Sequence, residues 1–127
     1  MRTKAIVVSN NPSASLVEGD RFIDGDLLQV MRTARDLVHQ GHLLISHPLA
    51  GSVKPNETPF KSIVLSRASK GRVDFDSLSV MEGSLRTAIR MLQEKSLPLY
   101  PDRILQDFQL IDRELLDYAL ASIPEYL

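Results

Sequence analysis

The sequence contains no cysteine, and this one absence excludes several kinds of chemistry. The chain forms no disulfide, has no thiolate nucleophile, and offers no cysteine ligand to zinc or to an iron–sulfur cluster. Its three histidines, His39, His42 and His47, follow no regular spacing, so we expect no metal site. A protein of this composition that works near redox chemistry does not carry the electrons on thiols.

The sequence also lacks an excess of charge and any long apolar run. Fifteen Lys and Arg residues against sixteen Asp and Glu residues leave a formal net charge of -1, so no overall field attracts nucleic acid or an anionic membrane. No apolar run approaches the roughly 18 residues that a membrane-spanning helix needs, and the N-terminus passes from Met1, Arg2 and Lys4 into a short apolar run only. We therefore expect a cytoplasmic protein without nucleic-acid or membrane partners.

What the chain does contain is enough apolar material for one core. Its 127 residues fit a single domain, and 43% hydrophobic with 24% charged residues is ordinary for a soluble globular protein. No internal repeat or low-complexity tract interrupts it. We therefore treat residues 1–127 as one domain.

Apolar patterning indicates the fold class. Residues 5–8 form an apolar run of the kind found in strands buried on both faces, and residues 43–46 and 63–65 are two further strands. Between them, residues 27–40 carry apolar side chains at helical spacing, with Asp26 as the cap. Strand, helix and strand in this order suit a right-handed crossover with parallel pairing. We predict a small three-layer Rossmann-like α/β domain with a short, mostly parallel sheet and about three helices.

Two more helices complete the prediction. One is opened by Asp76 or Ser77 and ends near Lys95, and the other, residues 102–122, is capped by Asp102. Apolar residues four and three apart give this last helix a broad stripe: Ile104, Phe108, Ile111, Leu115 and Tyr118. Such a stripe fits either a helix packed into the monomer core, which we favour, or a contact in a homodimer.

The stretch that stands out for function is the polar loop at residues 47–58. It combines proline and glycine breaks with a histidine, a lysine, a glutamate and several hydroxyl and amide groups, and loops on a rigid scaffold are where binding groups concentrate. In open parallel sheets ligands bind beyond the carboxyl ends of the strands, where Asn10 and Asn11 also lie. We therefore expect these two polar clusters to face one another.

The composition of the loop suits a small carboxylate or phosphate ligand. Lys54 supplies a positive charge, and the backbone amides around Gly51 and Ser52 form an anion-binding nest. His47 and Glu57 are the catalytic candidates, since either is able to move a proton. The predicted ligand-binding residues are Asn10, Asn11, His47, Gly51, Ser52, Lys54, Asn56 and Thr58.

Plainer interpretations compete with these. His47, before Pro48, also suits a backbone hydrogen bond at a strand end, and Lys54 with Glu57 also suits a solvated surface pair. No phosphate-binding or dinucleotide-binding glycine motif occurs, so we expect no cofactor. Ser52 and His47 lack the nucleophile-elbow sequence of a hydrolase.

The same loop carries a resemblance to a known family. The run HPLAGSVKPNETPF at residues 47–60, the strand at 62–66 and the segment DFDSL at 74–78 are similar to the GrdX family, over roughly residues 4–92. These small proteins are encoded beside glycine, sarcosine and betaine reductase in amino-acid-fermenting anaerobic bacteria. The resemblance implies this metabolic setting and assigns no activity or catalytic residue. Without cysteine, the chain is not itself the redox carrier of such a reductase, which leaves accessory roles.

Three hypotheses follow from the loop and the resemblance. The first, which we favour, is an accessory domain that binds a small anion such as a carboxylate or an acyl phosphate at residues 47–58. The second is a module that docks on a reductase subunit through this loop or through the last helix. The third is an enzyme that uses His47 or Glu57 for acid–base chemistry, for example a small hydrolase of an acyl phosphate.

Overall fold

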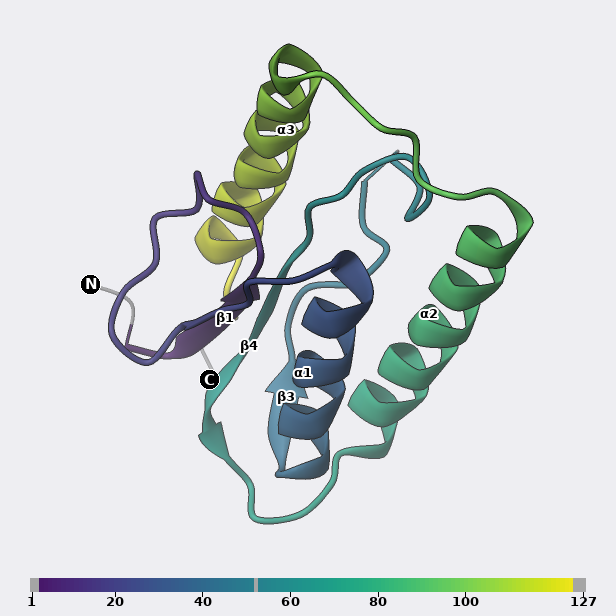
Figure 1. Cartoon of the computed structure of the whole chain (residues 1–127). Helices are drawn as coiled ribbons and strands as arrows, with labels where there is room; N and C mark the ends of the chain where they lie inside the picture. Colours follow the sequence, from purple (N-terminus) through teal and green to yellow (C-terminus); the bar gives the residue numbers. More distant parts are fainter. Residues whose placement is uncertain (1–2, 52, 125–127) are drawn as a thin grey trace.

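The part of the chain that the structure describes, residues 3–51 and 53–124 of a computed structural model, forms four strands and three helices (Figure 1). The strands are β1 (Ala5–Ser9), β2 (Arg21–Phe22), β3 (His42–Leu44) and β4 (Ser62–Ser69). The helices are α1 (Leu27–His39), α2 (Phe75–Glu94) and α3 (Asp102–Ala121). The predicted α/β class with three helices is therefore confirmed. Among the described residues, no helix has the length and apolar character needed to cross a membrane.

The first helix has the limits that its sequence predicts. Asp26 accepts a hydrogen bond from the backbone N of Gln29 at 2.9 Å, and the Gln29 side chain accepts one from the backbone N of Asp26 at 2.8 Å. This reciprocal arrangement satisfies two backbone donors that the first turn leaves unpaired. Beyond the other end, Gly41 has φ +100°, and a Cβ there would lie 3.0 Å from the backbone N of Gly71. Glycine alone fits this turn without strain.

The second helix begins earlier than predicted. Its cap is Asp74 rather than Asp76 or Ser77, because Asp74 accepts hydrogen bonds from the backbone N of Ser77 at 3.0 Å and from its hydroxyl at 2.8 Å. These hydrogen bonds hold the pKa of Asp74 below its usual value. The Ser77 hydroxyl also accepts from the backbone N of Leu44 at 3.0 Å. The start of α2 is thereby attached to β3.

The sheet is mixed, so the prediction of a mostly parallel, Rossmann-like sheet is wrong. The strand order is β2-β1-β4-β3, and only the two-residue contact of β1 with β2 is parallel. Strand β4 pairs antiparallel with β1, from Ala5 opposite Ser66 to Ser9 opposite Ser62, and antiparallel with β3 on its other side. Strands β1 and β3 do run in the same direction, as a crossover requires, but β4 lies between them. An apolar run buried on both faces occurs in such a central antiparallel strand as readily as in a parallel one.

Helices cover both faces of the sheet (Figure 1). Alternate residues of β1 and β4, among them Val8 and Ile63, pack against α1 and α2 in the larger core cluster. The residues between them, Val7 and Val64, face the opposite way and pack against Leu116 of α3. The second face therefore depends on α3 for its cover.

The last helix is much less buried than the other two. Of its residues only Asp112 and Leu116 are buried, while Leu110 is 56% and Tyr118 76% exposed. Leu116, Ala119 and Leu120 of this helix pack against the core, whereas Ile111 and Tyr118 of the broad stripe are exposed. The predicted cap at Asp102 is wrong, because Pro101 occupies the cap position and no side chain makes a capping hydrogen bond.

Candidate functional site

Asn10, one of the predicted ligand-binding residues, is used to hold the chain together. Its amide nitrogen donates to the carbonyl oxygens of Gly25 at 3.0 Å and Pro59 at 2.8 Å, and its Oδ1 accepts from the backbone N of Lys61 at 2.9 Å. Both amide hydrogens are therefore occupied by the protein. This residue connects the end of β1 to Pro59 and Lys61, directly after the polar loop.

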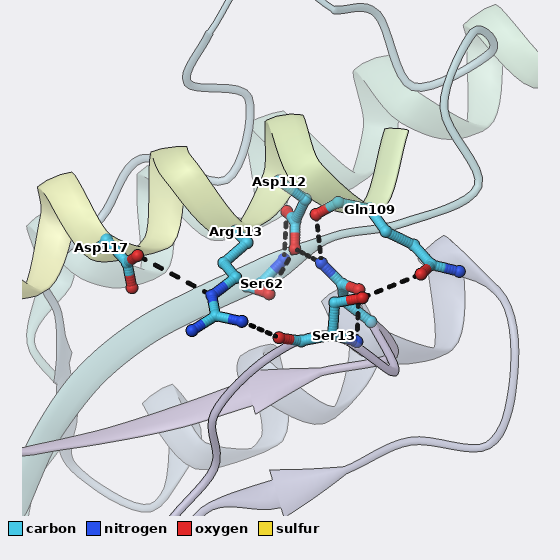
Figure 2. A network of polar contacts seen from close by, with 7 residues as sticks. Ser13, Ser62, Gln109, Asp112, Arg113 and Asp117 are labelled. Atoms are coloured by element: carbon cyan, nitrogen blue, oxygen red, sulfur yellow. Dashed lines mark hydrogen bonds and ion pairs between the residues drawn. The ribbon is translucent and has the colours of Figure 1, made fainter. Parts of the chain in front are cut away.

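Asn11 belongs to a buried polar network that reaches α3 (Figure 2). Its Nδ2 donates to the Gln109 carbonyl oxygen at 2.9 Å and to Asp112 Oδ2 at 3.0 Å. Asp112 also accepts from the backbone N of Ser62 at 3.0 Å and from the Ser62 hydroxyl at 2.6 Å. The Ser62 hydroxyl is in turn 2.7 Å from that of Ser9. One carboxylate of α3 thus joins the ends of β1 and β4.

Further contacts extend this network along the surface (Figure 2). Ser13 donates from its hydroxyl to Gln109 Oε1 at 2.9 Å, and Arg113 donates to the Ser13 carbonyl oxygen at 3.2 Å. Arg113 also lies 3.9 Å from the carboxylate of Asp117, one helical turn further on. These exposed contacts contribute little energy individually, but they attach the same side of α3 to the loop after β1.

The polar loop divides into two parts. Its second part packs near the end of α2: Asn56, which is buried, donates to the Met91 carbonyl oxygen at 3.1 Å, and the Tyr100 hydroxyl donates to the carbonyl oxygen of Glu57 at 2.6 Å. The exposed side chain of Glu57 accepts from the backbone N of Lys54 at 3.0 Å, and Thr58 is buried with its hydroxyl near the Phe60 backbone. These groups shape a turn and do not surround a common cavity.

The first part of the loop lies beside α3. His47 is exposed, and its Nδ1 accepts from the backbone N of Leu49 at 3.0 Å, so the hydrogen of the neutral ring is on Nε2. Gly51 has φ +92°, and a Cβ at that position would lie 2.9 Å from Leu115 of α3. Ser52, the other half of the predicted anion nest, lies outside the described residues.

Between this part of the loop and α3 lies a cavity of about 270 Å³, which we name the Lys61 cavity. Leu115 and Leu116 of α3 form part of its apolar wall. Seven side chains with polar atoms border it: Ser46, His47, Lys61, Ser62, Asp112, Tyr118 and Ser122. Among the predicted site residues that the structure describes, His47 is the one that borders this cavity.

Lys61 is the unusual group in this cavity. The residue is only 7% exposed, and its Nζ makes no hydrogen bond or close ion pair with any of the described residues. Burial lowers the pKa of the Lys61 ammonium, and the negative charge of Asp112 offsets this in part. A largely desolvated cation that a neighbouring carboxylate compensates only in part is costly, so an anion that enters the cavity gains a counter-charge already in place.

Larger hollows elsewhere lack such a group. One of about 420 Å³ runs along β3 and α2 past Lys70 and Asp74, but Asp74 is already occupied as the cap of α2. Another of about 450 Å³ at the start of α1 includes Asn10 and Thr58 within a mainly apolar lining. Among the described residues, no three metal-ligating side chains gather closely enough to hold an ion. The Lys61 cavity is therefore the strongest candidate site.

Sequence reasoning missed Lys61, Ser62 and Asp112. Lys61 sits between Phe60 and a strand, where a lysine resembles an ordinary solvated loop residue. A signal for Asp112 was present, since it occupies a helical position in line with Phe108 and Leu116, where an apolar residue is expected. A charge inside an apolar stripe indicates a buried polar contact.

These features define a small α/β domain with a mixed sheet, whose candidate site is a cavity containing a buried lysine under the C-terminal helix. The family model for GrdX-like proteins matches residues 6–121, and the chain belongs to this family. The match includes all of α3, which lies beyond the resemblance noted over residues 4–92. No curated protein and no solved structure matches the chain.

The Asp112 network generates a prediction about stability. In Asp112→Asn an amide NH₂ group would replace one carboxylate oxygen. This group would then face the donors of Asn11 or Ser62, which would lose their acceptor inside the protein. We expect the free energy of unfolding to fall by about 2–3 kcal/mol in urea denaturation, the cost of leaving buried donors unsatisfied. Asp107→Asn, at an exposed position of the same helix, is the control and should change it by less than about 0.5 kcal/mol. Equal effects of the two substitutions would contradict the structural role of Asp112.

Lys61 generates a prediction about pH. Its pKa is lower in the folded state than in the unfolded chain, so between the two values the unfolded chain binds more protons and the free energy of unfolding rises with pH. Lys61→Met removes this dependence. We expect the variant to have a larger free energy of unfolding than the wild type at pH 7. The difference between the two should shrink as the pH approaches about 10, near the ordinary lysine pKa. Lys54→Met, at an exposed site, should show no such trend, and a constant gap for Lys61→Met would contradict the assignment.

Proposed function

We propose that the protein is an accessory component of glycine reductase-type amino-acid fermentation that binds a small carboxylate or phosphate compound in the Lys61 cavity. Membership of the GrdX-like family supports the link to glycine reductase-type systems. The observation that carries the binding role is the largely buried side chain of Lys61, whose Nζ lines the cavity without a hydrogen bond to any of the described residues. The site of the proposal therefore includes His47 from the predicted loop but takes Lys61 in place of Lys54 as the cation.

The neighbours of Lys61 favour an anion. All three hydrogen bonds that Asp112 accepts come from uncharged donors, so its carboxylate is held without the help of Lys61. Lys61 is left as the hydrogen-bond donor with spare capacity in the cavity, and its three N–H groups suit a carboxylate or phosphate oxygen. At the rim, the Nε2–H of His47 is a second donor.

The size of the cavity favours a small ligand. A volume of about 270 Å³ is just below the range of drug-sized pockets, which suits a compound of a few heavy atoms. Gly51 contacts the same α3 residue, Leu115, that lines the cavity, so backbone amides of the loop are near its wall. An anion nest at Gly51 and Ser52 stays part of the proposal.

The remaining predicted ligand-binding residues have structural roles in this proposal. Asn10 positions the chain at Pro59 and Lys61, and Asn11 bonds to α3, whereas Lys54, Asn56 and Thr58 build the turn that leads to Lys61. The hydrolase hypothesis has less support, because Glu57 does not border the Lys61 cavity and its side chain is engaged with the backbone of Lys54.

Ligand-induced stabilisation tests the binding role. Glycine, acetate, phosphate and acetyl phosphate would each be titrated into the wild type, Lys61→Met and Lys54→Met while the melting temperature is recorded. We expect at least one anion to raise the melting temperature of the wild type and of Lys54→Met. The same anion should bind Lys61→Met roughly 10- to 100-fold more weakly, because this variant loses one hydrogen bond to a charged group.

Two results would count against this assignment. If Lys54→Met abolished the response and Lys61→Met kept it, the binding site would be the exposed loop rather than the cavity. If none of the four compounds stabilised the wild type at millimolar concentration, the small-anion role itself would fail.

A docking role on a reductase subunit is the second candidate, and the outward flank of α3 favours it. Leu110 and Tyr118 are large, exposed side chains on a helix that the rest of the chain covers on one side only. Immobilised protein should retain reductase components from an extract of cells that use the reductase, and Leu110→Ser with Tyr118→Ser should reduce the retained amount.

Phe75→Ser, which removes an exposed aromatic side chain of α2, is the control and should retain the components. Recovery of no reductase component at low salt would contradict the docking role. Sedimentation of the same samples shows whether the chain is a monomer or a homodimer. It therefore distinguishes docking on a reductase subunit from the homodimer contact considered for residues 102–122.

A further inference from the structure

We propose that Lys61 is a nucleophile, and that the small carboxylate it receives is a 2-oxo acid or an aldehyde acid, with which it forms an imine. This inference rests on the proposed function and makes the ligand class more specific. It stands on three features of the cavity: an amine without a hydrogen-bond partner among the described residues, a carboxylate in the same wall, and a histidine at the rim.

The first requirement of imine formation is an uncharged amine. An ammonium has no lone pair, and a lysine in water is almost entirely ammonium at neutral pH. Burial lowers the pKa of Lys61, which raises the fraction of neutral amine. A hydrogen bond from Nζ to a protein acceptor would restrain this amine, and none links it to the described residues.

The second requirement is a cavity that lets the carbonyl reach Nζ. Lys61 lines the cavity together with the apolar side chains of Leu115 and Leu116, and the volume accommodates a compound of about five or six heavy atoms, on the order of the smallest pocket ligands. Apolar walls exclude water from the reacting centre, which favours the imine over its hydrolysis.

The step balances without an oxidant or a reductant. The lone pair of Nζ attacks the carbonyl carbon, a C–N bond forms, and the carbonyl oxygen takes up a proton to give a carbinolamine. The nitrogen has by then lost one proton, and its lone pair expels the hydroxyl group as water when a second proton is supplied. His47, exposed at the rim of the same cavity, donates a hydrogen bond from its Nε2–H to the departing hydroxyl oxygen, and the solvent at this rim supplies the proton itself. The products are the imine and one water molecule.

Asp112 has a stabilising part in this scheme rather than a proton-transfer part. Its oxygens already accept three hydrogen bonds, and its negative charge acts on Lys61. A protonated imine keeps a positive charge at the position of Nζ, so the same carboxylate stabilises the product. The positive charge also faces the carboxylate of the ligand itself, which is why an oxo acid suits the site better than a neutral aldehyde.

Reductive trapping tests the inference. Wild type, Lys61→Arg and Lys61→Met would be incubated with glyoxylate or pyruvate and sodium cyanoborohydride at pH 7, and the adducts located by peptide mass spectrometry. We expect one adduct per wild-type chain, formed on Lys61 at least tenfold faster than on Lys54, and no adduct at position 61 in either variant. Lys61→Arg keeps the positive charge but forms no imine, so it should retain stabilisation by acetate or phosphate.

The two proposals fail in different ways. If glyoxylate and pyruvate labelled Lys61 no faster than Lys54 while acetate or phosphate still stabilised the wild type, the imine would be overturned and the anion site would stand. If neither acetate nor phosphate stabilised the wild type, the anion site would fail, a result that does not involve trapping. Adducts on Lys61 that form equally fast in urea-unfolded protein would also overturn the inference, because the cavity would contribute nothing.

Discussion

The carboxylate of Asp112 is the contact on which the arrangement of the C-terminal helix depends. Apart from Asp112, only Leu116 of α3 is fully buried, so few apolar contacts hold this helix on the sheet. Asp112 compensates by accepting hydrogen bonds from Asn11, at the end of β1, and from the backbone and hydroxyl of Ser62, at the start of β4. Hydrogen bonds to a buried charge are directional, so they fix the position of α3 on the sheet. Hydrophobic packing alone would allow the helix to slide.

The same contact explains why Lys61 has no partner. The negative charge of Asp112 acts on Lys61, but the Asp112 oxygens accept their hydrogen bonds from neutral donors of Ser62 and Asn11. The carboxylate therefore has a structural role, and the ammonium is left to face the cavity. A protein built only for stability would gain by replacing such a lysine with an apolar residue, because an unpaired buried charge is expensive. That cost is the physical argument for a ligand at this position.

The sequence predicts local structure here better than it predicts pairing. The stripe of α1 and its cap at Asp26 follow from helical periodicity and capping chemistry, which involve neighbours in the chain. The place of β4 between β1 and β3 does not follow, since an apolar run such as 63–65 is compatible with parallel and antiparallel partners. The candidate site was predictable in part: Asp112 interrupts an apolar stripe, but the burial of Lys61 depends on how α3 lies across the strand ends, a contact between distant parts of the chain.

The direction of the strands, rather than their pairing, decides which residues lie at the edge of the sheet to which the sequence analysis assigns the site. Strands β1, β2 and β3 run the same way, because β2 is parallel to β1 and both β1 and β3 are antiparallel to β4. Their carboxyl ends therefore share one edge of the sheet, and the amino end of β4 lies at the same edge. That end contributes Lys61, which meets His47, just beyond β3, at the Lys61 cavity. In an all-parallel sheet the residues before a strand would lie at the opposite edge, far from His47. Because β4 lies antiparallel between β1 and β3, Lys61 at its amino end lies near the carboxyl ends of these two strands. Such strand ends leave room for a ligand.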